Sequence, residues 1–179
     1  MPATLKQLSD NEIQIFNECM HQQRNTGVRL VDTSSEWLFK DYESIHDEYL
    51  RLFEQSTDEN IKLEALKRLI FLNWNGLLED EYYTGIKSLN KQTIFNSYKA
   101  LDFYIKENKL NEELKEMLLF YSCWDWLILD FSENKLESLS TFVKTVDPNG
   151  SFTYKSLNRA AMDNRGRMGI YWKELLERI

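Results

Sequence analysis

Turn-forming residues are scarce in this sequence: six glycines and two prolines are spread over 179 residues. An all-β sandwich or barrel needs such residues at nearly every strand end, so this chain has too few of them. Hydrophobic residues make up 42% of the chain, which is enough to fill the core of one domain. We therefore expect a single all-α domain over residues 1–179, with six to eight helices packed as an irregular bundle or a short stack of helix pairs.

Helix-start residues precede apolar residues at helical spacing along most of the chain. The predicted helices cover roughly residues 10–25, 35–55, 58–75, 91–105, 112–131 and 133–145 and the last segment from residue 169, with a short helix that ends at Gly85. The capping candidates are Ser9, with Glu12 at capping-box spacing, Ser34 or Ser35, Thr57, Asn90 and Asn111.

The segment 141–155 has two interpretations. Asp147–Gly150 reads DPNG, which is typical of a tight turn, and the residues on both sides of it alternate between polar and apolar. A small hairpin over 141–155 is therefore an alternative to a helix that reaches about residue 145.

Charge is distributed unevenly along the chain. The net charge is -7, and the C-terminal segment 151–179 holds six basic and three acidic side chains, so it is basic while residues 1–150 are strongly acidic. An acidic protein is poorly suited to neutralise phosphates, so we expect no nucleic-acid partner. The N-terminus lacks the pattern of a signal peptide, no apolar run reaches the roughly 20 residues of a membrane span, and the two cysteines are far apart in the chain. These features predict a cytoplasmic protein with reduced thiols and no membrane partner.

Both histidines follow a glutamate by three residues, in the pairs Glu18–His21 and Glu43–His46. Such pairs bind two metal ions in ferritin-like bundles. Helical geometry places both pairs away from the apolar stripes of their helices, toward water. The common phosphate-binding, dinucleotide-binding, zinc and serine-nucleophile motifs are also missing from the sequence, so we predict neither a metal nor a cofactor.

The stretch YSCWDWLILDF, residues 121–131, contains Asp125 between two tryptophans. If residues 112–131 form one straight helix, Asp125 lies about 40° from Tyr121, on the apolar face. A buried carboxylate needs a partner, and arginines of the basic C-terminal segment are the candidates. Asp125 then either anchors that segment or forms the floor of a pocket. The pocket candidates are Trp74, Tyr121, Trp124, Asp125, Arg165 and Arg167.

A second candidate site lies in the stretch EDEYYTG. Three acids and two tyrosines are suited to contact a basic protein partner: Glu79, Asp80, Glu81, Tyr82 and Tyr83. The alternative is an ordinary helix start with both tyrosines packed inward.

We therefore expect a non-enzymatic binding protein for a basic protein partner, of the adaptor, antitoxin or toxin-neutralising kind. The alternative is an enzyme or small-molecule sensor with an aromatic pocket around Asp125.

Overall fold

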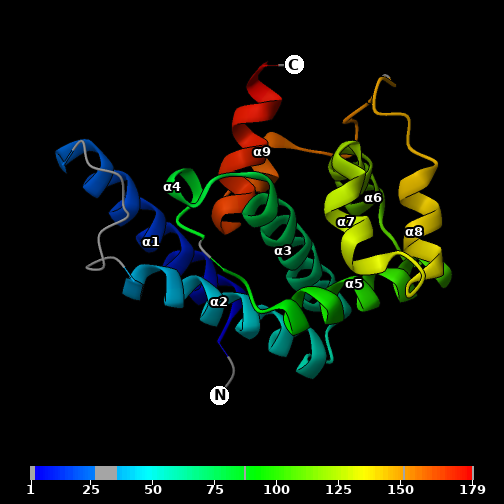
Figure 1. The fold of residues 1–179 in the computed structure, drawn as a ribbon, viewed down its shortest axis with the longest axis horizontal. Helices are drawn as coiled ribbons and strands as arrows, with labels where there is room; N and C mark the ends of the chain where they lie inside the picture. The colour runs from blue at the N-terminus through cyan, green and yellow to red at the C-terminus, as the bar shows by residue number, and fades with distance from the viewer. Residues whose placement is uncertain (1–2, 27–35, 87, 151, 179) are drawn as a thin grey trace.

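The computed structural model describes residues 3–26, 36–86, 88–150 and 152–178, and every regular element in this part of the chain is helical (Figure 1). The prediction of an all-α fold with six to eight helices is confirmed, if the single turn α4 is set aside. The helices are α1 Leu5–Thr26, α2 Glu36–Gln55, α3 Glu59–Leu78, α4 Glu81–Thr84, α5 Lys91–Lys106, α6 Glu112–Tyr121, α7 Asp125–Ser132, α8 Glu137–Lys144 and α9 Gly166–Arg178. Two 3₁₀ turns, Ser122–Trp124 and Arg159–Met162, precede α7 and α9.

Helix α3 runs through the centre of the molecule, with α1 and α2 on one side and α6, α7 and α8 on the other (Figure 1). All eleven residues from Ala65 to Asn75 are buried, whatever face of the helix they occupy. A helix that is buried all round has neighbours on every side. Helix α3 is therefore the central helix of the described structure.

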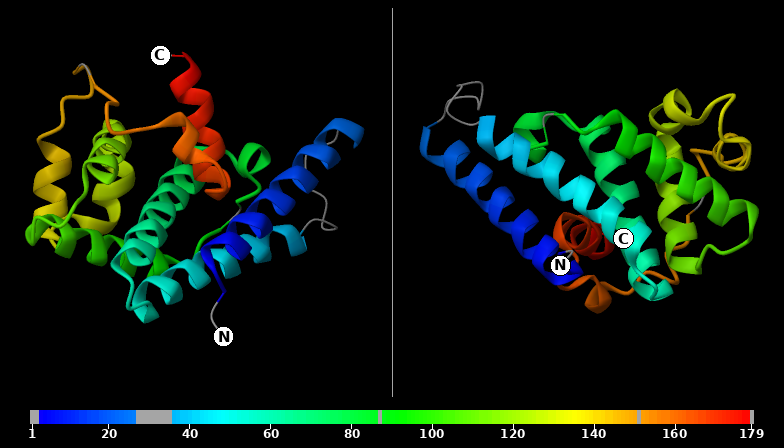
Figure 2. Two further views of the ribbon diagram at one scale, coloured as in Figure 1. Left: turned by 180° about the vertical axis from the view of Figure 1, so that it is seen from behind. Right: turned by 90° about the horizontal axis from the view of Figure 1, so that it is seen from below.

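The C-terminal helix α9 returns to the first part of the chain. It lies beside α1 and α3, as the views in Figures 1 and 2 show. Trp172 and Met168 of α9 are buried in the same core as Leu8 of α1 and Leu69 of α3. The two ends of the chain are therefore held by one hydrophobic core.

Several predicted helix boundaries are confirmed by the hydrogen bonds that make them. The side chains of Asn90 and Asn111 accept bonds of 2.9 Å from backbone N–H groups two and three residues further on. Helix α4 ends at Gly85, whose φ of 74° suits glycine, and a Cβ there would lie 2.7 Å from the sulfur of Cys19. The start of α3 is capped by Asp58, one residue later than predicted, and Ser34 and Ser35 lie outside the described residues.

Other boundaries differ from the prediction. Helix α1 begins at Leu5, so Ser9 and Glu12 lie inside it and do not form a capping box. Helix α8 continues to Lys144, so the alternative hairpin over 141–155 is wrong; the DPNG turn does form, with Gly150 N–H donating to the carbonyl of Asp147 over 2.9 Å. None of the described helices is both long and apolar enough to cross a membrane.

Candidate functional site

The predicted burial of Asp125 is wrong: its side chain is exposed, at the first position of α7. The helix expected over 112–131 is interrupted by the 3₁₀ turn Ser122–Trp124, and Trp124 has φ -113° and ψ 60°, far from helical values. This break rotates the following residues, so that Leu127 and Ile128 face the core instead. The carboxylate of Asp125 accepts a bond of 2.8 Å from the backbone N–H of Trp126, and among the described residues it has no ion pair.

The aromatic residues of the expected pocket are packed against one another in the core. Trp74 and Tyr121 are fully buried, with stacked rings whose centroids lie 4.9 Å apart. Trp124, which is half-buried, meets Trp74 edge-on at 5.5 Å, and the indole N–H of Trp172 donates to the hydroxyl of Tyr121 over 2.9 Å. Edge-on and offset contacts of this kind stabilise a core, and they occupy the space that a ligand would need.

Arg165 does pair with acids, but with the half-buried Glu64 of α3 and Glu113 of α6 rather than with Asp125. Its Nε donates to Glu64 over 2.8 Å, its Nη2 contacts the second oxygen of Glu64 at 2.5 Å, and its Nη1 pairs with Glu113. Lys67 also pairs with Glu113. Burial raises the pKa of Glu113, but the bonds from Arg165 and Lys67 outweigh it, so the pKa lies below its ordinary value.

Glu12 is buried, which its position in the sequence did not predict. Its carboxylate accepts a hydrogen bond from the hydroxyl of Tyr49, and another of 3.0 Å from the backbone N–H of Arg167 in the first turn of α9. A carboxylate at a helix N-terminus is favourable because it meets unpaired N–H groups and the positive end of the dipole. Burial nevertheless raises the pKa of Glu12 above its ordinary value.

Glycine at position 166 is required by this arrangement. Gly166 has a φ of 58°, and a Cβ there would lie 2.4 Å from a carboxylate oxygen of Glu12. In the described part of the chain, Arg167 forms no ion pair with Asp125; its guanidinium stacks on the ring of Phe16, at 3.6 Å from the ring centroid.

Arg68 connects the charges around Arg165 with Glu12, because it contacts both Glu64 and the hydroxyl of Tyr49 that donates to Glu12. It donates to the hydroxyl of Tyr49 over 3.1 Å, to the carbonyl of Leu5 over 2.9 Å and to Glu64 over 2.8 Å. The result is one largely buried ionic network, formed by Glu12, Glu64, Lys67, Arg68, Glu113 and Arg165. It ties α1 and the start of α9 to α3 and α6, and since its charges pair with one another, its role is structural.

His46 also differs from the prediction, because it is fully buried rather than facing water. Its Nε2 lies 2.7 Å from the side-chain oxygen of Asn73 in α3. Burial lowers its pKa to about 4. His21 is exposed, so the two histidines do not share an environment, and the described residues hold no cluster of three or more His, Cys, Asp or Glu side chains able to bind a metal.

The acidic stretch around α4 lies at the surface. Glu79 and Asp80 are exposed, and Tyr83 is 61% exposed, which excludes an inward-packed Tyr83. Glu81 is half-buried, and the side chain of Tyr82 is outside the described part of the structure. A second acid–aromatic pair, Asp125 and Trp126, is exposed at the start of α7, where Trp126 is 53% exposed. Trp124, just before it, contacts Trp74 near the end of α3, so both features lie toward the C-terminal end of α3.

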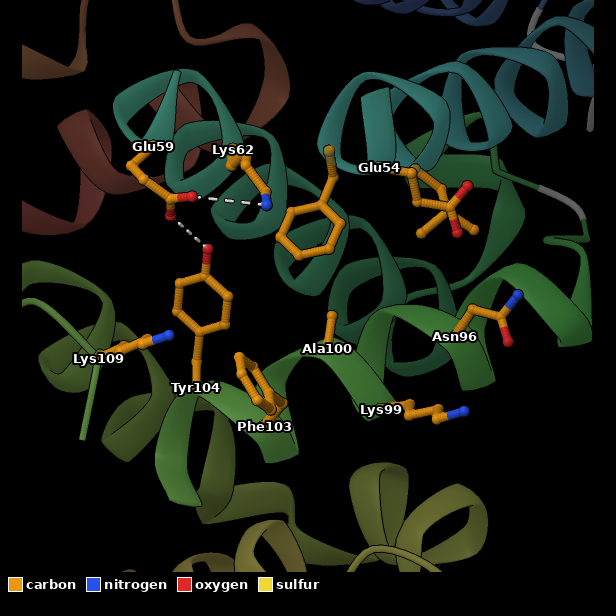
Figure 3. A pocket seen from close by; sticks show the side chains of 11 residues that line it. Glu54, Glu59, Lys62, Asn96, Lys99, Ala100, Phe103, Tyr104 and Lys109 are labelled. Atoms are coloured by element: carbon orange, nitrogen blue, oxygen red, sulfur yellow. Dashed lines mark hydrogen bonds and ion pairs between the residues drawn. The ribbon is translucent and has the colours of Figure 1, made fainter. Parts of the chain in front are cut away.

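A groove of about 610 Å³ opens between α2, α3 and α5 (Figure 3). Its apolar lining includes Phe53, Ala100 and Phe103, and Phe103 is 48% exposed. Its charged lining comprises Glu54, Glu59, Lys62, Lys99 and Lys109. Phe103 lies off the apolar stripe of α5, so an aromatic residue on the polar face was the sequence signal that could have located this groove.

Comparison with known proteins does not extend this description: no family model, no curated protein and no solved structure matches the chain.

Proposed function

We propose that this chain is a non-enzymatic binding protein that contacts a basic protein partner through the acidic residues and tyrosine of the segment 79–83. The observation that carries the proposal is Tyr83, which is 61% exposed and has Glu79 and Asp80 exposed beside it. Large exposed aromatic side chains are costly to leave in water and are typical of interface centres. Neighbouring acids attract a basic partner and orient it. Trp126 and Asp125 form a second contact of the same chemistry.

The ion pairs of the C-terminal segment support an acidic exterior. Arg165 pairs with Glu64 and Glu113 inside the protein, and Lys173 pairs with Asp163 within the segment itself. Neither of these two positive charges pairs with Glu79 or Glu81. The net charge of -7 therefore acts mainly at the surface, where it speeds association with a basic protein.

The alternative of an aromatic pocket around Asp125 loses its structural basis, because Trp74 and Tyr121 fill the core and Asp125 lies outside it. A cytoplasmic location is part of the proposal, and two free cysteines, one of them buried, are consistent with it.

The proposal is tested by affinity capture from the native cells at increasing NaCl concentration. The test variant combines Glu79→Gln with Tyr83→Ser, and the control Glu107→Gln removes one exposed carboxylate next to the end of α5, outside both the segment 79–83 and the groove between α2, α3 and α5. We expect a basic protein to be captured by the wild type and by the control, to be lost with the test variant, and to dissociate as salt rises. Capture that is insensitive to salt, or lost only with the control, would contradict the proposal.

A further inference from the structure

The groove between α2, α3 and α5 has more basic than acidic side chains in its lining, on a protein with a net charge of -7. Among its acids, Glu59 already has two partners: it pairs with Lys62 at 3.5 Å and accepts a hydrogen bond of 3.1 Å from the hydroxyl of Tyr104 (Figure 3). Lys62 in turn lies 5.3 Å from the centre of the Phe53 ring. These contacts satisfy the charges at one end of the groove internally.

Lys99 and Lys109 remain without a carboxylate among the residues that the structure describes. Both are exposed, and the ammonium group of Lys109 lies 4.8 Å from the centre of the Phe103 ring. Glu54, on the α2 side of the groove, is exposed and has no ion pair in the described structure. Two lysines on the α5 side therefore face one glutamate on the α2 side, which leaves a positive groove on an acidic protein.

The apolar floor lies between these lysines. Phe103 is 48% exposed, and Phe53 and Ala100 are half-buried beside it. Lys99 and Lys109 are separated by most of the last two turns of α5 and a short loop, a span of roughly 10 Å or more at 1.5 Å per helical residue. Two cations at this separation on either side of an aromatic floor exceed the reach of a single carboxylate group.

We propose that this groove binds an acidic peptide segment of a second partner protein, with an aromatic or long aliphatic side chain on Phe53 and Phe103 and carboxylates at Lys99 and Lys109. An extended peptide or one helical face presents two acids at this spacing with an apolar residue between them. The carboxylates lie on the α5 side, because Glu54 repels them on the α2 side. This site is separate from the segment 79–83 and opposite to it in charge preference, so each can fail without the other.

Selection from a phage-displayed library of random 12-residue peptides on the full chain tests the site. We expect the enriched peptides to carry an aromatic or long aliphatic residue between Asp or Glu residues. Their dissociation constants, measured by fluorescence anisotropy with fluorescein-labelled copies, should rise roughly tenfold or more in the variant Lys99→Glu/Lys109→Glu, since two attractive pairs become repulsive. Phe103→Ser should weaken binding as well, and Glu54→Gln should strengthen it.

The matched control is Lys91→Glu/Lys115→Glu, which changes the net charge equally at two exposed lysines outside the groove. It should leave the affinity within about twofold of the wild type. Enrichment of basic peptides, failure to enrich any peptide, or equal affinity in the two charge-reversal variants would overturn the proposal. So would sedimentation of the chain alone as a dimer that Lys99→Glu/Lys109→Glu dissociates, because a second copy would then occupy the groove.

Discussion

Replacement of Arg165 by methionine is expected to lower the free energy of unfolding by about 3 kcal/mol. The side chain of Arg165 is 8% exposed, and its partners Glu64 and Glu113 are each 18% exposed. Removal of one partner from a buried ion pair costs about 3–5 kcal/mol, because the remaining charge is left without compensation. Glu64 keeps Arg68 at 2.8 Å and Glu113 keeps Lys67, so the expected cost lies at the lower end. Methionine is similar in length and preserves the apolar packing.

Urea denaturation followed by tryptophan fluorescence measures this change, since Trp74 and Trp172 are buried and report on the core. With a denaturant dependence of about 2 kcal/mol per molar urea, 3 kcal/mol shifts the midpoint by about 1.5 M. The control is Arg159→Met, which breaks the pair between Arg159 and Glu177, two side chains that are each 54% exposed. That pair is worth about 0–1 kcal/mol.

The reasoning is refuted if Arg165→Met moves the midpoint by less than about 0.3 M, or by no more than Arg159→Met does. A double-mutant cycle with Glu113→Gln separates the ion pair from the packing. We expect a coupling free energy of roughly 1–3 kcal/mol between the two substitutions, and additivity would mean that the pair itself contributes little.

Three further predictions concern single positions. In an NMR titration, the ring of His46, assigned with the variant His46→Gln, should stay neutral until the pH approaches about 4. Because burial lowers the pKa of His46, the free energy of unfolding is at its full value above the unfolded-state pKa of about 6.5 and falls by up to roughly 3 kcal/mol as the pH drops toward 4. Titration of the ring near pH 6.5 would contradict its burial. Gly169→Ala should lower the melting temperature by several degrees, since the added Cβ would lie 2.2 Å from the backbone oxygen of Met162, which cannot move as a side chain does. Asp125→Asn should change the free energy of unfolding by no more than about 1 kcal/mol in urea denaturation, because Asp125 is exposed and only helps to start α7; unfolding of this variant would restore the buried role that the structure contradicts.

The helices and many of their ends could be predicted because their causes are local. The Asn90 and Asn111 caps form with N–H groups two or three residues away, and Gly85 supplies the left-handed backbone that ends α4. Such contacts are encoded in a few adjacent residues, so spacing and residue type are sufficient to predict them.

The candidate site residues were harder to predict because their positions depend on helix register. The position of Asp125 was predicted for one straight helix, and the 3₁₀ turn Ser122–Trp124 invalidated that assumption. In α1, Glu12 was predicted only as a capping-box residue, whereas the buried face of the helix holds Leu8, Glu12 and Cys19. A hydrophobic stripe is located from its apolar residues alone, so it does not show when a polar residue lies on the buried face as well.

By itself, the sequence determined an acidic, all-helical protein and the surplus of basic residues in its last 29 residues. Only the tertiary structure decided which charges are buried and with whom: Arg165 meets Glu64 at a separation of 101 residues, and the backbone N–H of Arg167 meets Glu12 at 155. The physical reason is one of range. A helix satisfies its own hydrogen bonds within four residues, but a buried carboxylate is stable only if a distant element brings a donor or a cation to it.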